Sequence, residues 1–75
     1  MKIEILGMGC PKCEILYENA KKAVGEKGIQ AEIIKVEDID KIADYGVMMT
    51  PALVIDGEVK SSGKVLSIEE IKKWL

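Results

Sequence analysis

One stretch of the sequence decides the fold: Met49-Thr50-Pro51-Ala52-Leu53-Val54-Ile55-Asp56-Gly57. Its continuous apolar run, residues 52–55, is bounded by turn-forming residues, which is typical of a buried strand. The Asp-Gly pair after the run is a strong signal for a two-residue hairpin turn. We therefore expect a second strand over residues 58–60, antiparallel to the first, and a hairpin that the chain enters through a proline.

Strands and helices alternate in the part of the chain that precedes this hairpin. Lys2–Leu6 is rich in β-branched residues and ends at a glycine, so it predicts a strand. Pro11 suits the first turn of a helix, and apolar residues then recur at helical spacing as far as Gly28. Residues 31–36 predict another strand. Because a helix joins these two strands, they should be parallel.

Two further helices complete the predicted order. Asp38 can cap a short helix that Gly46 ends, between the second and third strands. Ser67-Ile68-Glu69-Glu70 has the Ser-x-x-Glu form of a capping box, so a last helix should begin there. The order β-α-β-α-β-β-α predicts a single α/β domain over residues 1–75. It should hold a four-stranded mixed sheet flanked by helices.

Composition excludes several classes of function. The chain has 75 residues, of which 48% are hydrophobic, and a net charge of −2. All of its cations are lysines, which argues against a nucleic-acid or phosphate-binding surface. It shows neither a basic region followed by an apolar stretch nor an apolar run of the ~20 residues that cross a bilayer. We expect a cytoplasmic, monomeric protein that binds no membrane.

The two cysteines are spaced as Cys10-Pro11-Lys12-Cys13, between the first strand and the first helix. In a cytosolic chain this spacing indicates redox or metal chemistry. Cys10 should face the unpaired N–H groups of the helix, and Lys12 adds a cation; such settings lower a thiol pKa from ~8.5 toward 7. Cys13 follows one helical turn later and can close a disulfide with Cys10. We expect Cys10 to be the nucleophile and Cys13 the resolving thiol.

A metal site is the alternative for the same residues. Met8-Gly9-Cys10-Pro11-Lys12-Cys13 resembles the Met-x-Cys-x-x-Cys loop of heavy-metal-associated domains and copper chaperones. Two thiolates do not fill the shell of zinc, but they can hold Cu(I). The loop by itself leaves exchange chemistry and Cu(I) binding both open. The heavy-metal domains run β-α-β-β-α-β and finish on a strand, whereas this chain should finish on a helix.

Taken whole, the chain resembles the thioredoxin superfamily in its smallest, glutaredoxin-like form, including short microbial and archaeal redox-active disulfide proteins. Two motifs support the resemblance: Cys10-Pro11-Lys12-Cys13 after the first strand and Met49-Thr50-Pro51 before the third. It implies an oxidoreductase that reduces protein disulfides through a Cys10–Cys13 disulfide and needs no dissociable cofactor. It also implies a thioredoxin-reductase-like partner. A third possibility is an interaction module whose thiols only report redox state.

The resemblance assigns roles to three further residues. Pro51 should be cis and pack against the disulfide, and Thr50 should offer its backbone to a substrate chain. Glu4 stands six residues before Cys10, where thioredoxins keep a buried carboxylate that moves protons to and from the resolving thiol.

Two further features bear on which electron donor and which partner proteins the chain should accept. The polar loop expected at residues 61–64 does not reproduce the glutathione-binding segment of glutaredoxins, so a protein reductase is the expected electron donor. A soft apolar rim around the thiols is expected from three methionines, Met8, Met48 and Met49.

Overall fold

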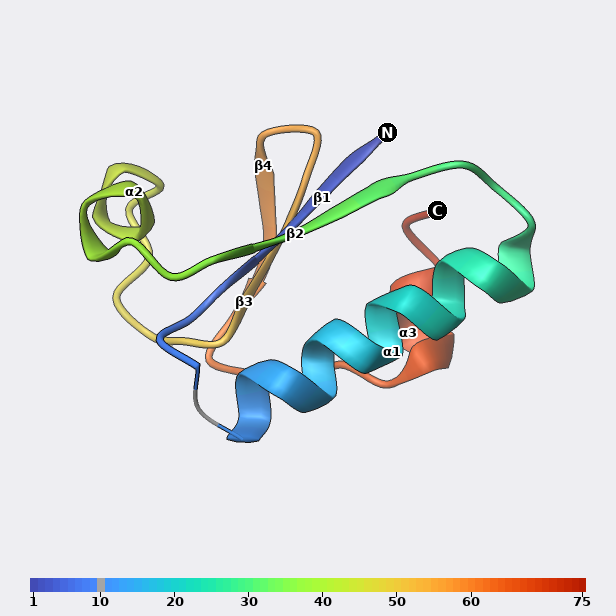
Figure 1. Ribbon diagram of the computed structural model, residues 1–75, viewed down its shortest axis with the longest axis horizontal. Coiled ribbons are helices and arrows are strands. Elements are labelled where there is room, and N and C mark those ends of the chain that lie inside the picture. The colour runs from blue at the N-terminus through green and yellow to red at the C-terminus, as the bar shows by residue number, and fades with distance from the viewer. Residues whose placement is uncertain (10) are drawn as a thin grey trace.

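The computed structural model describes residues 1–9 and 11–75, and Cys10 lies outside the described residues. Its elements follow the predicted order, β-α-β-α-β-β-α (Figure 1). Their bounds are β1 Lys2–Leu6, α1 Pro11–Lys27, β2 Glu32–Val36, α2 Ile39–Asp44, β3 Ala52–Ile55, β4 Glu58–Ser62 and α3 Ile68–Lys72.

The four strands form one mixed sheet in the order β2-β1-β3-β4. β1 and β2 are parallel, while β3 is antiparallel to both β1 and β4, as predicted for the first pair and the last pair. Leu6 at the end of β1 stands opposite Val36 at the end of β2 and Ala52 at the start of β3. Three segments therefore meet at one edge of the sheet. Two of them leave β1 at Gly7 and β2 at Glu37, and the third, Thr50-Pro51, leads into β3.

Helices cover both faces of the sheet: α1 and α3 lie on one face and α2 lies on the other (Figure 1). Alternate side chains of β1 serve the two layers. Ile3 and Ile5 pack with Leu16 of α1 and Ile71 of α3. Leu6 packs in a second, smaller cluster, which also contains Val36, Ile42, Ala52 and Val54.

The turn between β3 and β4 is the predicted hairpin turn, because Asp56 and Gly57 both have positive φ, 49° and 86°. The expectation of a polar loop from residue 61 was wrong for its first two residues. β4 continues through Ser62. A bulge places one extra residue of β4 opposite the Leu53–Val54 step, and beyond it Ser61 and Ser62 pair with Leu53 and Ala52. Serine has little strand propensity of its own, so the pairing here comes from the neighbouring strand.

The two predicted caps are present. The Asp38 side chain accepts a hydrogen bond from the Asp40 N–H at 2.9 Å at the start of α2. Ser67 and Glu70 form the reciprocal capping box of α3, at 3.2 and 3.1 Å. Within residues 1–9 and 11–75, no helix is long and apolar enough to cross a membrane.

Candidate functional site

Cys13 is held at the start of α1 against the end of β1. Its side chain is buried, with 6% exposed, on the helix face that packs on the sheet. A Cβ placed on Gly7 would overlap the Cys13 sulfur and lie 3.1 Å from the Cys13 Cβ. Gly7 also donates its N–H to the Val36 carbonyl at 3.0 Å, which continues the β1–β2 ladder by one residue. The sulfur of Cys13 therefore occupies the space that a side chain at Gly7 would need.

The Thr50–Pro51 peptide bond is cis, the geometry that the family resemblance implies. Pro51 is fully buried, while Thr50 beside it is exposed. The Pro51 carbonyl accepts a hydrogen bond from the Gly63 N–H at 2.9 Å, which ties this segment to the end of β4. The Cβ of Thr50 lies 4.0 Å from the Cβ position of Gly7, so Thr50 and Cys13 approach the same glycine.

The segment from Gly7 to the first turn of α1 is described except at Cys10. The expected nucleophile and its disulfide with Cys13 therefore lie outside the described residues. Lys12 is exposed on the first turn of α1, two residues after Cys10 in the chain. Gly9 has a φ of 80°, which favours glycine, and the Glu37 Oε2 lies 3.7 Å from its Cβ position. A carboxylate thus approaches the thiol-bearing loop from the end of β2.

Glu4 is buried, with 8% exposed, as the relay hypothesis requires. Its side chain lies on the α2 face of the sheet, where the Tyr45 hydroxyl donates to Oε1 at 2.7 Å. This bond to a carboxylate raises the pKa of Tyr45, and burial adds to the effect. Glu4 stands three residues before Gly7, about 10 Å away along an extended strand. The relay role of Glu4 stays a prediction, and its hydrogen-bond partner on α2 was not anticipated.

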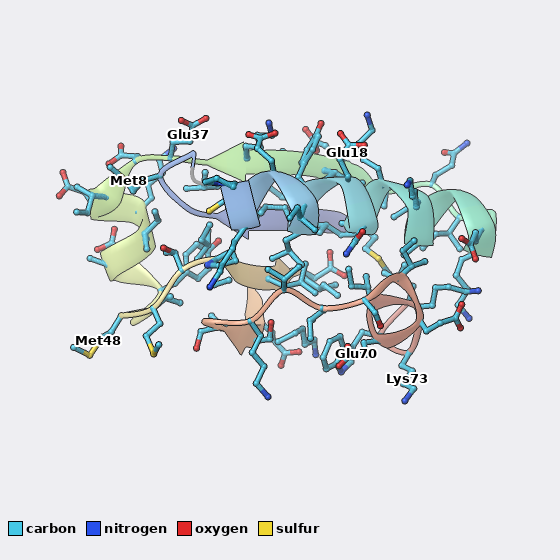
Figure 2. All side chains as sticks on the ribbon, turned by 90° about the horizontal axis from the view of Figure 1, so that it is seen from below. Met8, Glu18, Glu37, Met48, Glu70 and Lys73 are labelled. Carbon is cyan, nitrogen blue, oxygen red and sulfur yellow. The ribbon has the colours of Figure 1, made fainter. Side chains whose placement is uncertain are left out.

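A pocket of about 230 Å³ opens beside the cis proline, between α2 and the loop after β1. We call it the α2 groove and define it by its lining residues: Met8, Ile39, Ile42, Ala43, Val47, Met48 and Thr50. Met8 and Met48 lie at the end of the molecule where α2 packs (Figure 2). Both residues line the α2 groove, and a methionine rim around the thiols stays a prediction. Met49 instead packs on Gly63, with its Cβ at 3.1 Å from that glycine's Cβ position.

Comparison with known proteins places this geometry in a family. A family model described as a thioredoxin domain matches residues 1–75. A thioredoxin of Methanothermobacter thermautotrophicus is 49% identical over 75 residues, which cover 100% of this chain and 97% of that protein. A thioredoxin of Methanocaldococcus jannaschii is 52% identical over 73 residues, covering 97% of this chain and 84% of the relative. The chain belongs to the thioredoxin family.

Family membership agrees with the architecture and with the resemblance found in the sequence. A thioredoxin-type redox protein is supported, whereas the Cu(I)-binding alternative is not favoured. The chain also has a helix, α2, between β2 and β3, which differs from the β-α-β-β-α-β order of the heavy-metal domains.

Three features of this thioredoxin site escaped the sequence analysis. Gly7 was noted only as the end of a strand, although it makes room for a sulfur. Tyr45 reaches Glu4 across 41 residues, a separation at which no local pattern signals a contact. Ile39 was assigned only to a short helix, yet it is 64% exposed in the α2 groove. No signal in the sequence marked it, because Ile39 and Ile42 are three residues apart and this spacing predicts that both face the core.

Proposed function

We propose that this thioredoxin-family protein reduces protein disulfides through Cys10 and Cys13. The observation that supports the proposal most is the position of Cys13. It is buried at the first turn of α1, against Gly7, and this glycine is also approached by Thr50 of the cis-proline segment. A resolving thiol needs such protection, because it must attack the neighbouring Cys10 sulfur rather than a solvent oxidant.

The proposed chemistry is a two-step thiol–disulfide exchange. The Cys10 thiolate attacks one sulfur of a partner disulfide, so a Cys10–partner bond forms and the other partner sulfur leaves as a thiolate. Cys13 then loses its proton and attacks the Cys10 sulfur, which forms the Cys10–Cys13 bond and releases the second partner thiolate. Two electrons pass from the dithiol to the partner, and both released thiolates take up protons.

The proposal gives the surrounding residues definite tasks. Lys12, exposed on the first turn, stabilises the Cys10 thiolate together with the helix N-terminus. Thr50 offers its exposed backbone to the partner chain, and Pro51 closes the site beside the disulfide. Glu4 moves the proton of Cys13. No dissociable cofactor takes part, a thioredoxin-reductase-like protein restores the dithiol, and the reaction takes place in the cytoplasm.

The roles of the two thiols are tested by trapping. Cys13→Ser should accumulate a covalent Cys10–partner disulfide when mixed with an oxidised test protein, because the second step is removed. Cys10→Ser should trap nothing, because the attacking sulfur is missing. Non-reducing gels and mass spectrometry of the adduct measure both. An adduct formed by Cys10→Ser and not by Cys13→Ser would reverse the assignment.

The reaction itself is tested by turnover. The intact chain, with dithiothreitol as electron source, should reduce the test protein's disulfide repeatedly at neutral pH, whereas both cysteine variants should not. A reversible Cys10–Cys13 disulfide without turnover would contradict the proposal and favour an interaction module that only reports redox state.

A further inference from the structure

The α2 groove leaves large apolar side chains exposed to water, and this exposure is unfavourable unless another surface covers them. Met48 is 97% exposed, Ile39 64% and Met8 61%, and all three line the same groove. Exposed apolar residues are ordinary when scattered, but a contiguous patch on a small protein marks a contact surface. Methionine adapts its shape to different partners, because its side chain is unbranched and polarizable.

The groove is continuous with the candidate site. Thr50 lines the groove and immediately precedes the cis Pro51. Met8 lines the groove and immediately follows Gly7, against which the Cys13 sulfur packs. A polypeptide whose sulfur reaches the thiols would therefore lay its neighbouring side chains over the groove.

The size of the groove selects the kind of occupant. Its volume of about 230 Å³ is below the roughly 300–1,000 Å³ of pockets that enclose small-molecule ligands. A space of this size suits one aliphatic side chain of a partner chain.

The charges next to the groove select the partner further. Glu37, Asp38 and Asp40 precede or begin α2, and we call them the acidic segment. Glu37 approaches the loop at Gly9, on the Met8 side, and both residues lie at the same corner of the molecule in Figure 2. Asp40 directly follows the groove residue Ile39 and lies one helical turn before Ala43.

Nearby cations offset only part of this acidic charge. Lys35 interacts electrostatically with Glu37, but its ammonium is paired directly with both Glu14 oxygens at 2.8 Å. Lys41 and Asp44 line the separate pocket around Glu4, where their charges balance. Over the described residues, the ion pairs include none of the three carboxylates of the acidic segment. A complementary partner would therefore carry positive charge beside its apolar side chain.

We propose that the α2 groove and the acidic segment select target disulfides whose cysteine has an aliphatic residue and a Lys or Arg within a few positions. This specificity rests on the proposed reduction of disulfides. The aliphatic side chain enters the groove, the cation faces Glu37 and Asp40, and the target sulfur is thereby presented to the thiols. The electrostatic part acts mainly on the rate of association, so salt weakens it.

Three short peptides test the proposal. In each peptide, a single cysteine forms a disulfide with the same chromogenic aryl thiol. The peptides differ only in two residues close to that cysteine, which are Leu and Lys, Leu and Glu, or Ser and Lys; we call them the Leu/Lys, Leu/Glu and Ser/Lys peptides. Attack on the peptide sulfur forms the protein–peptide disulfide and releases the aryl thiolate, which absorbs light. Second-order rates with the reduced full-length chain are divided by the rates with dithiothreitol, which removes intrinsic reactivity.

We expect the Leu/Lys peptide to react about tenfold faster than the Leu/Glu peptide at about 0.02 M salt, and the ratio to shrink toward one at about 0.5 M salt. The Leu/Lys peptide should exceed the Ser/Lys peptide about tenfold at both salt concentrations, since one buried aliphatic side chain contributes about 1.5 kcal/mol or more. Equal corrected rates for all three peptides overturn the proposed specificity and leave the proposed function standing. No reaction with any peptide overturns the proposed function itself.

Charge variants of the protein locate the effect. Glu37→Lys, outside the helix, and Asp40→Lys, in its first turn, should each reduce or reverse the Lys/Glu ratio. Glu18→Lys makes the same charge change at an exposed position of α1 (Figure 2) and should keep the ratio. Met48→Ser should remove the Leu/Ser preference without changing the charge ratio. Rates are compared as ratios between peptides within each protein variant, so changes in thiol reactivity cancel. If the Lys/Glu rate ratio changes equally in Glu37→Lys, Asp40→Lys and Glu18→Lys, the assignment to the acidic segment is overturned.

Discussion

Gly7 shows how a single missing side chain shapes the site. Most glycines of this chain lie where the backbone conformation favours glycine, since φ is positive at Gly9, Gly28, Gly46, Gly57 and Gly63. Gly7 has no such φ, so any non-glycine residue could adopt its backbone. What excludes a side chain there is the sulfur of Cys13, which fills the space.

Gly7→Ala should therefore destabilise the protein by about 1–3 kcal/mol, because the added methyl forces Cys13 out of its place. It should also speed the alkylation of Cys13 by a maleimide in a Cys10→Ser background. Urea unfolding and labelling rates measure the two effects. Gly25→Ala is the matched control: a Cβ meets nothing within 4 Å there, and alanine in α1 should stabilise by about 0.5–1 kcal/mol. Equal behaviour of the two variants would contradict the steric role of Gly7.

The Glu4–Tyr45 pair ties α2 to the sheet through one hydrogen bond to a buried carboxylate. The pKa of Tyr45 is raised from 10.0, so the folded chain keeps the phenol proton at pH values where the unfolded chain releases it. The stabilisation is thus fully present below pH 10.0 and is lost as the pH rises above it.

Tyr45→Phe should cost about 1–2 kcal/mol at pH 8, because Glu4 loses the hydroxyl that solvates it. The difference in free energy of unfolding from the parent should shrink as the pH rises past 10.0. Urea unfolding at a series of pH values measures both. Tyr17→Phe serves as control, since its ring contacts Lys35 while Glu4 is untouched. A cost that is absent at pH 8 would show that the bond contributes nothing.

At the scale of elements, α3 is the clearest case of a helix that depends on its cap. Its five residues, Ile68–Lys72, are too few for a stable helix in isolation. The capping box of Ser67 and Glu70 satisfies N–H groups of its first turn, and Ile71 is fully buried in the core shared with α1. Hydrogen bonds from the Ser67 backbone and side chain lower the pKa of Glu70 below its usual 4.5.

Ser67→Ala should lower the free energy of unfolding by about 1 kcal/mol, because the Glu70 N–H loses its acceptor. Urea unfolding measures the difference.

The contribution of Glu70 to stability is present above pH 4.5 and is lost as the pH falls, since the folded carboxyl holds its proton less firmly than the unfolded one. Glu70→Gln should therefore flatten part of the acid-side fall in stability between about pH 5 and 3. Glu69→Gln, the exposed neighbour whose contact with Lys72 is 3.6 Å, should leave that fall nearly unchanged. Thermal unfolding across this range distinguishes them.

At the scale of the whole molecule, the topology of the sheet assembles the site. Parallel β1 and β2 end at the same edge, and β3, antiparallel to β1, begins there. This edge collects Gly7, Glu37 and Pro51, which are far apart in the chain. α1 starts beside this edge and carries Cys13, while α2, which lies on the opposite face of the sheet (Figure 1), contributes Ile39, Ile42 and Ala43 to the groove.

The sequence by itself determined the features that depend on neighbours within a turn or two. These are the order and type of the elements, the caps at Asp38 and Ser67, the Asp56-Gly57 hairpin and the Cys10–Cys13 spacing. Each rests on hydrogen bonds or dihedral preferences of adjacent residues, so a short window contains the whole signal. The family resemblance extended this to the cis geometry of Pro51, which local residues do not specify.

Only the tertiary structure decided the contacts between distant segments. These contacts depend on strand register and on how the helices pack on the sheet. They are the packing of Cys13 on Gly7, the Tyr45–Glu4 hydrogen bond, the bulge in β4 and the α2 groove. A shift of one residue in the register of β1 would turn Glu4 to the other face of the sheet, away from Tyr45. Such contacts follow from the packing of the complete chain, and no short stretch of residues specifies them.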